Sequence, residues 1–468
     1  MKDSLVPRLR AILSWIHDNR QGKHYLAGQS NRFQKAIPIC LFFRFMLPCK
    51  LKRIAMTRTP ATNSSNELGN WLETLAVEPE LGRLLAPAPE EREVAGYGHT
   101  LVEICQQPLL WADTARRAIQ MNDRLAELLK GAQWVMIAGS GSSQYAGECV
   151  HPALRGEVGI PVLTAGGGWL LLEGLRGIPP SRPGLLVSLA RSGDSPESAG
   201  VVELYLETAP WVRHLVITCN GDGQLATRFR DGERVTVLML DARTNDRSLV
   251  MTSSFTNMAI AARALGWLGR ADTLESTVKL LSGACRHLLL HHAQQIASVA
   301  RGCFSRAVYL GSGCRFGAAR ESALKMLEMN AGTIPTLAET YLGLRHGPMC
   351  LIDGETLVVC FLSSDPLARA YEEDLIAELQ CKQIGARRLI VGEDIPQALV
   401  DANDVALEIP GLAALGDDNV AVLDVVAGQL LAFFRCLAGG LKPDMPSSGV
   451  ISRVVNGFTV RRRKMETD

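Results

Sequence analysis

The chain has 468 residues, enough for two or three domains, and its 47% apolar and 21% charged residues are the balance of a soluble globular protein. The net charge of +1 argues against a nucleic-acid-binding surface, which needs a clustered basic excess, and the basic run at 461–464 is typical of a solvated tail. The twelve cysteines form no C-x-x-C pair and no Cys/His metal spacing, so we expect neither disulfides nor a metal site.

Residues 1–55 differ in character from the rest of the chain. Their apolar segment 37–48 resembles a short signal core, but Arg44 interrupts it and it is too short to cross a bilayer. We therefore expect 1–55 to be a non-globular or spurious extension without a membrane role, and Met56 is an alternative start. Residues 56–110 are expected to form a helical N-terminal segment.

A first domain is expected over residues 111–280. Short apolar runs predict strands at 134–139, 162–165, 185–190, 214–219 and 235–240. Amphipathic segments separate these runs, and the one at 195–209 begins with a Ser cap and a Pro at its first helical position. Apolar strands alternating with helices predict a parallel sheet covered on both faces.

The same pattern restarts in a second domain, expected over residues 281–440. A helical region at 253–299 leads into predicted strands at 307–312, 356–363, 387–392 and 404–409, and an apolar helix at 420–437 closes the set. Each set begins with a strand that runs into a glycine-serine turn, which is a weak internal repeat. The predicted fold class is α/β, with two tandem domains that each hold a doubly wound parallel sheet flanked by helices. Residues 441–468 are expected to be an irregular tail.

The first glycine-serine loop, A-G-S-G-S-S at 138–143, joins a predicted strand to a predicted helix. Its glycines permit a tight turn, and helix-start amides together with the hydroxyls of Ser142 and Ser143 suit a phosphate group. The loop lacks the Lys-Ser/Thr ending of a nucleotide P-loop and the G-x-G-x-x-G pattern of dinucleotide sites. A plain strand-to-helix turn explains such a sequence equally well, so both interpretations stay open.

A second loop rich in hydroxyls follows the predicted strand at 185–190 and reads R-S-G-D-S-P-E-S over 191–198. Two such loops at the carboxyl ends of strands in one sheet can converge on a single ligand. The alternative is that Ser195 serves only as a helix N-cap. The two roles are compatible, because an N-cap serine lies beside the amides that would hold an anion. Together the loops favour a phosphate ligand.

Glu321, Lys325 and Glu328 stand at spacings of four and three, which on a helix brings them within about 60° of one face. His346 follows in an H-G-P turn. Two carboxylates, an ammonium and an imidazole that converge are suited to proton transfer. The alternatives are a solvated helix face with intrahelical ion pairs and a loop histidine hydrogen-bonded to the backbone.

Five motifs in order resemble the sugar isomerase (SIS) domain family. They are SGSSQYAG at 140–147, ARSGDSPES at 190–198, MTSSFTNM at 251–258, ESALKMLE at 321–328 and ETYLGLRHGPM at 339–349. Within the family the chain is similar to the isomerase half of glucosamine-6-phosphate synthase. It is most similar to the bacterial galactosamine-6-phosphate deaminases, also described as tagatose-6-phosphate ketose/aldose isomerases. The resemblance implies two tandem SIS domains and no cofactor.

The resemblance also implies roles for individual residues. Sugar-phosphate binding is implied at Ser142, Ser143, Ser192 and Ser195, with Arg191 beside them. Glu328 matches the glutamate that moves a proton between C1 and C2, and Lys325 and Glu321 match polar residues that line the site. His346 matches the histidine that helps to open the sugar ring from the neighbouring subunit, so a homodimer with composite sites is implied.

The chain departs from the synthase at several positions. Arg191 stands where the synthase has glutamine and Ala190 where it has serine, and the interval from Glu328 to His346 is longer. No lysine occupies the place of the synthase's C-terminal lysine, and Arg453 is the candidate substitute. No N-terminal nucleophilic cysteine of a glutaminase half precedes Leu101, which favours release of ammonia or simple isomerisation over synthesis from glutamine.

The expected function is the deaminating isomerisation of galactosamine 6-phosphate to tagatose 6-phosphate and ammonia in the cytoplasm. One alternative is a simple aldose/ketose isomerase that acts on tagatose 6-phosphate. Another is a non-catalytic sugar-phosphate sensor, which would need the serine loops but neither Glu328 nor His346. A transcriptional sensor would also need a basic recognition helix, and residues 56–110 show none. The sequence leaves the galacto and gluco substrates open.

Overall fold

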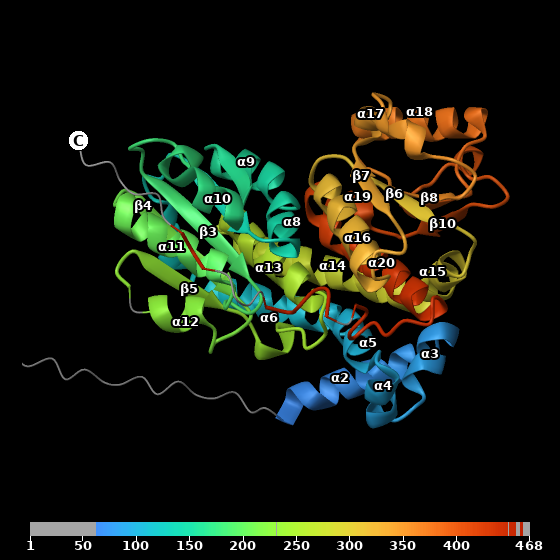
Figure 1. Ribbon diagram of the computed structural model, residues 1–468, viewed down its shortest axis with the longest axis horizontal. Coiled ribbons are helices and arrows are strands. Elements are labelled where there is room, and N and C mark those ends of the chain that lie inside the picture. The colour runs from blue at the N-terminus through green and yellow to red at the C-terminus, as the bar shows by residue number, and fades with distance from the viewer. Residues whose placement is uncertain (1–61, 231, 448, 455–458, 462–468) are drawn as a thin grey trace, which may run out of the picture. The chain divides into compact units, whose positions relative to one another are not determined.

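The computed structural model describes residues 62–230, 232–447, 449–454 and 459–461, and these belong to one compact unit (Figure 1). The expectations for residues 1–55 and for a start at Met56 lie outside the described residues. Within the expected segment 56–110, the described residues from Thr62 onward are mostly helical. The N-terminal helices are α2 (Thr62–Leu75), α3 (Pro79–Leu85), α4 (Pro89–Ala95), α5 (Gly98–Cys105), α6 (Gln107–Gln120) and α7 (Asn122–Leu129).

The first sheet holds five parallel strands in the order β2-β1-β3-β4-β5. Its strands are β1 (Val135–Gly139), β2 (Val162–Gly166), β3 (Gly184–Ala190), β4 (Val212–Thr218) and β5 (Val235–Met239). Its helices are α8 (Ser142–Glu148), α9 (His151–Val158), α10 (Gly167–Glu173), α11 (Pro196–Thr208) and α12 (Gln224–Phe229). The two central strands β1 and β3 are buried along their whole length, as expected of a sheet covered on both faces.

Helices α13 (Ser253–Arg263), α14 (Ala271–His291) and α15 (Ala293–Ala300) connect the two sheets. The expectation of helix over 253–299 is confirmed, with two interruptions. A 3₁₀ turn at Ala264–Trp267 follows α13, and Gly269 has a φ of +75°, which an α-helix cannot accommodate. The chain bends again at His292, between α14 and α15.

The second sheet is also parallel and has the order β10-β9-β8-β6-β7. Its strands are β6 (Arg306–Leu310), β7 (Thr336–Glu339), β8 (Thr356–Phe361), β9 (Arg387–Gly392) and β10 (Val405–Glu408). Its helices are α16 (Cys314–Met329), α17 (Tyr341–Leu344), α18 (Pro366–Lys382), α19 (Leu412–Leu415) and α20 (Asp417–Ala438). If the strands of each sheet are numbered from one in chain order, the two sheets have the same order of neighbouring strands. Both sheets therefore share one topology. The predicted fold class is confirmed.

Helix α20 lies in the centre of the described unit. It is long and apolar enough to cross a membrane, but 89% of its most apolar window is buried within the protein, and it packs along α16 (Figure 1). We therefore interpret α20 as a core helix. This packing fixes the position of α16. Helix α16 carries Glu321, Lys325 and Glu328, which we call the charged triplet, and α8 of the first sheet also contacts it.

Candidate functional site

The loop between β1 and α8 is held in a conformation that depends on glycine. A Cβ at Gly139 would lie 2.4 Å from the carbonyl carbon of Ser143, so any side chain there would collide with the first turn of α8. Gly141 has a φ of +56° and a ψ of −127°, a region that other residues rarely enter. The turn therefore brings Ser142 and Ser143 to the carboxyl end of the sheet, where both side chains are largely buried.

The loop between β3 and α11 places a second set of hydroxyls at the same end of the sheet. Ser195 occupies the N-cap position of α11, but its side chain makes no capping hydrogen bond, so its hydroxyl is not consumed by the helix. Ser192 is held in place because its hydroxyl accepts a hydrogen bond from the amide of Asp194, at 3.2 Å, and its carbonyl accepts one from Asn220 Nδ2, at 2.8 Å.

Both loops line one cleft of about 490 Å³, which lies in the usual size range of small-molecule sites. Glu328 reaches this cleft from α16, and the C-terminal segment 450–453 forms another part of its wall. The structure thus brings Ser142, Ser143, Ser192 and Ser195 together with one carboxylate of the charged triplet. The arrangement offers neutral donors for an oxyanion beside a group that can carry a proton.

The charged triplet on α16 converges as its spacing predicts. Lys325 and Glu321 are completely buried, and Glu328 is about one-quarter exposed. The Lys325 ammonium pairs with Glu328, and its Nζ lies 3.4 Å from Glu321 Oε1. It also donates a hydrogen bond to Ser142 Oγ at 3.0 Å. Lys325 therefore links the Glu328 carboxylate to the serine loop.

Burial decides the charges of this cluster. It raises the pKa of Glu321 to about 8, although Lys325 acts in the opposite direction. Burial would also lower the pKa of Lys325, but Glu321 and Glu328 more than offset it and hold that pKa above its ordinary value. At neutral pH the cluster is best described as a protonated Glu321 beside a cationic Lys325. The positive charge of Lys325 is then directed to Glu328 at the cleft.

Arg191 lines the cleft, but its guanidinium faces carbonyl groups of the protein. The side chain is 7% exposed. Nη1 donates to the carbonyls of Ser248 and Leu249, at 3.3 and 3.0 Å, and Nη2 donates to that of Arg453, at 3.0 Å. Three of its five N–H groups are therefore used inside the chain.

His346 lies apart from these residues within the described chain. It is exposed, in the turn that follows α17 on the second sheet, and it is not among the residues that line the cleft. The structure therefore brings eight of the nine predicted site residues to the cleft or its charged cluster. None of the histidines among the described residues lines the cleft.

Several cleft residues were not predicted as site residues. Ser140, Ser198, Leu249, Met251 and segment 450–452 also line the cleft. Met251 begins the motif at 251–258, so that motif was the available signal, and the Ser143 hydroxyl lies 3.9 Å from its sulfur. The tail offered no comparable signal, because nothing in its composition indicates that it returns to the first sheet.

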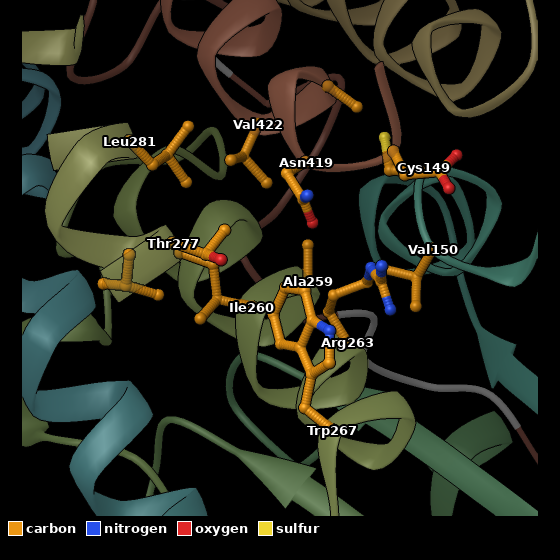
Figure 2. A pocket seen from close by; sticks show the side chains of 13 residues that line it. Cys149, Val150, Ala259, Ile260, Arg263, Trp267, Thr277, Leu281, Asn419 and Val422 are labelled. Carbon is orange, nitrogen blue, oxygen red and sulfur yellow. The ribbon is translucent and has the colours of Figure 1, made fainter. Parts of the chain in front are cut away.

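A second cavity lies between the junction of α8 with α9 and the helices α13, α14 and α20 (Figure 2). It holds only about 30 Å³, which is space for about one water molecule. Arg263, on its wall, packs over the Trp267 ring at 4.3 Å and donates to Glu157 at 2.8 Å. A cavity of this size with a mostly apolar lining cannot hold a sugar phosphate, so the serine-lined cleft is the candidate site.

Comparisons with known proteins agree with this geometry. No protein-family profile matches the chain. A Streptomyces coelicolor protein named provisionally as a D-galactosamine-6-phosphate deaminase is 36% identical over 370 residues, which cover 77% of this chain and 95% of that protein. An Escherichia coli protein named D-galactosamine-6-phosphate deaminase is 34% identical over 372 residues, covering 76% and 94%. The structure of a Clostridium novyi protein, described provisionally as a tagatose-6-phosphate ketose/aldose isomerase, superposes with a TM-score of 0.75 at 30% identity and covers 79% of this chain and 97% of that one.

Proposed function

The chain belongs to the D-galactosamine-6-phosphate deaminase family of sugar isomerase (SIS) domain proteins, and from this premise we propose that it converts galactosamine 6-phosphate and water into tagatose 6-phosphate and ammonia. The observation that carries the proposal is the contact of Lys325 with both Glu328 and Ser142. It joins a proton-carrying carboxylate to a loop that suits a phosphate.

The phosphate is held by the hydroxyls of Ser142, Ser143, Ser192 and Ser195. Hydrogen bonds from neutral hydroxyls to a charged acceptor are strong and geometrically specific. The two loops come from neighbouring strands β1 and β3, so they hold the phosphate at the carboxyl edge of the sheet. The remaining carbons of an open-chain hexosamine would extend from this point towards α16.

Glu328 acts as the proton shuttle. After ring opening, its carboxylate removes the proton from C2, the electron pair forms the C1–C2 double bond, and the C1 carbonyl oxygen takes up a proton, which gives an enolamine. Return of the proton to C1 leaves a C2 imine. Water then adds to C2 and the C–N bond breaks, which gives the ketose and ammonia. Lys325, fixed by the buried Glu321, keeps the Glu328 carboxylate turned towards the cleft.

His346 opens the sugar ring from a second subunit. Its exposed position outside the cleft supports this part of the proposal, since within one chain it does not line the site. The active form is therefore a cytoplasmic homodimer with composite sites. The SIS domains would comprise residues 111–280 and 281–440, and no cofactor takes part.

Replacement of Glu328 tests the chemistry. Glu328→Gln keeps the shape of the side chain but removes the base, so ammonia release should fall at least about 100-fold. Affinity for galactosamine 6-phosphate, measured by calorimetry, should stay within about threefold, because Glu328 does not hold the phosphate. Glu73→Gln alters an exposed glutamate of α2 and serves as the control. Full activity of Glu328→Gln would exclude the assignment.

A panel of hexosamine and ketose 6-phosphates tests the reaction itself, with ammonia and ketose measured in parallel. Release of both products from galactosamine 6-phosphate supports the deaminase. Interconversion of tagatose 6-phosphate with its aldose, without ammonia, would identify a simple isomerase, the activity in the description of the Clostridium novyi protein. Tight binding without turnover would identify a sensor. Comparison of galactosamine with glucosamine 6-phosphate decides the C4 configuration.

A further inference from the structure

We infer that Arg191 and Arg453 form a reciprocal clasp that holds the C-terminal segment 450–453 in place as a wall of the cleft. Arg191 is then a positioning residue for the site and not a phosphate ligand. The identity of the ligand rests on the proposed function, but the clasp itself does not. Two sets of hydrogen bonds form the clasp. In one the Arg191 side chain donates to the tail, and in the other the Arg453 side chain of the tail donates to the turn at 245–246.

In the first set of hydrogen bonds, the side chain of Arg191 holds the backbone of the tail. Its Nη2 donates to the carbonyl of Arg453 at 3.0 Å, while Nη1 donates to the carbonyls of Ser248 and Leu249. One planar guanidinium thus bridges the segment before α13 and the tail. A lysine has no such fork of donors and could not span these acceptors in the same geometry.

In the second set of hydrogen bonds, the side chain of Arg453 holds the segment before α13. Its Nε donates to the carbonyl of Asp246 at 2.9 Å, and its Nη2 donates to Asn245 Oδ1 at 2.5 Å. These groups direct its guanidinium to the 245–246 turn. The candidate substitute for the synthase's C-terminal lysine therefore has a structural task in this chain.

The turn that receives Arg453 is rigid. The Asp246 carboxylate accepts hydrogen bonds from the amides of Thr252, Ser253 and Ser254 at 2.8 to 3.0 Å, and all these groups are buried. This caps the start of α13 and leaves the Asp246 carbonyl in a fixed position. The clasp therefore joins the tail to one of the most constrained points of the first domain.

In the described part of the tail the other anchors lie on either side of the clasp, and downstream the side chain of Val460 lies against Gly200 of α11. Upstream it is fixed at Asp444, whose carboxylate accepts from the backbone and hydroxyl of Thr100 at 2.7 Å each. Beyond that point Val450 is 82% exposed. The hydrogen bonds that join residues 449–454 to the rest of the described chain all involve Arg191 or Arg453. Release of the clasp should therefore free segment 450–453.

The clasp also couples the tail to an anion in the cleft. Arg191 and Arg453 carry like charges that repel, and both line the cleft. A phosphate dianion bound there would offset that repulsion and so stabilise the closed tail. By linkage, a closed tail would favour the dianion by the same factor.

Limited proteolysis with trypsin measures the clasp directly, because the enzyme must cleave after Arg453, the residue whose carbonyl Arg191 holds. Loss of residues 454–468 is distinguished by mass from cleavage within the basic run 461–464. In the ligand-free protein, Arg191→Lys should speed cleavage after Arg453 roughly tenfold, since it loses hydrogen bonds of the fork. Arg182→Lys, at an exposed position, should not change it.

A second variant keeps the test independent of any folding defect in Arg191→Lys. Asn245→Ala removes an acceptor of Arg453 but does not line the cleft, and it should also speed cleavage after Arg453. Unchanged cleavage in both variants would overturn the clasp, as would a rise in the KM of Arg191→Lys with tail protection intact, because that result identifies a phosphate ligand. A wild-type chain that binds no sugar phosphate would refute the proposed function and leave the apo result valid.

Discussion

The carboxyl ends of the two sheets are built alike but are used differently. Both first strands run into a glycine turn of the same backbone shape, with φ and ψ of +56° and −127° at Gly141 and of +55° and −128° at Gly313. In the first sheet the serines that follow line an open cleft. In the second sheet the corresponding donors are already bound to carboxylates of the protein.

Two carboxylates occupy the carboxyl end of the second sheet, which we call the second end; the first end is that of the first sheet. Glu372 accepts from the Ser312 hydroxyl and from the Ser363 amide, both at 2.6 Å. Asp417 accepts from the Ser363 hydroxyl, and from the Ser364 amide at 3.0 Å. These are the groups that would hold an anion if the second sheet were used like the first. The chain therefore fills this end with its own carboxyl groups.

A third carboxylate completes the difference. Arg315 stands where Ser143 stands in the first loop, and it is completely buried. Its Nε and Nη2 donate to the two oxygens of Asp424, at 2.7 and 2.8 Å. The comparison teaches that a glycine-serine turn at a strand end is not sufficient for a ligand site. The turn becomes a site only where the fold leaves its donors without an internal partner.

The largest effect is expected from a substitution that breaks the ion pair of Arg315 with Asp424 at the second end. Asp424→Asn removes the closer carboxylate partner of the buried Arg315 guanidinium and leaves Asp417, 3.5 Å from Nη1, as the remaining ion-pair partner, which should lower the free energy of unfolding by about 3 kcal/mol. The KM for the sugar phosphate should not change at temperatures where the variant is folded. Urea unfolding and steady-state kinetics measure the two quantities, with exposed Asp374→Asn as the control. A loss of substrate affinity with little loss of stability would show that the second end binds substrate.

The converse is expected at the first end, with a smaller effect. Ser143→Ala should raise the KM about 10- to 100-fold, because a hydrogen bond to a charged group contributes about 1.5–3 kcal/mol. Its unfolding free energy should change by less than about 1 kcal/mol, since its hydroxyl contacts only a methionine sulfur among the described residues. Ser312→Ala removes a hydroxyl from the second loop, at the position that Ser140 has in the first, and it should lower stability while leaving the KM intact. Equal effects of both variants on the KM would contradict the comparison.

Sequence patterns were sufficient for most of the fold. The apolar runs predicted nine of the ten strands to within two residues at each end, because buried parallel strands are continuously apolar. Strand β7 (Thr336–Glu339) was missed because it has four residues, is only half-buried and lies at a sheet edge. Helical spacing alone predicted that Glu321, Lys325 and Glu328 share a face, and the structure places them in contact.

The different use of the two ends could not be predicted from local sequence. The turns at 138–143 and 310–315 look alike, and both sheets follow with a loop of serines. The groups that decide the outcome are distant: Glu372 lies 60 residues from Ser312, and Asp417 lies 54 from Ser363. The hydrogen bonds of Arg191 to carbonyls were equally hidden, since an arginine beside two serines suggests a phosphate ligand. Tertiary contacts decide these cases.

A third effect is expected in the pH dependence of stability at the second end. Burial raises the pKa of Glu372 to about 7 from an ordinary value of 4.5, although its hydrogen bond from Ser312 acts in the opposite direction. Between these values the unfolded chain has lost the proton while the folded chain still holds it. Glu372 therefore lowers stability progressively as the pH rises through this window, and its contribution is constant above it.

Glu372→Gln removes this titration but keeps an oxygen acceptor for one of the two donors. The unfolding free energy of the variant minus that of the wild type should therefore increase from pH 4.5 to 7 and then level off. Subtraction at each pH cancels the groups that both proteins share, including Glu321 at the first end. A flat difference between pH 4.5 and 7 would mean that the folded-state pKa of Glu372 is not raised above its ordinary value. A difference that falls with rising pH below about 4.5 would mean that the loop donors lower its pKa, so that the second end retains the anion affinity proposed for the first.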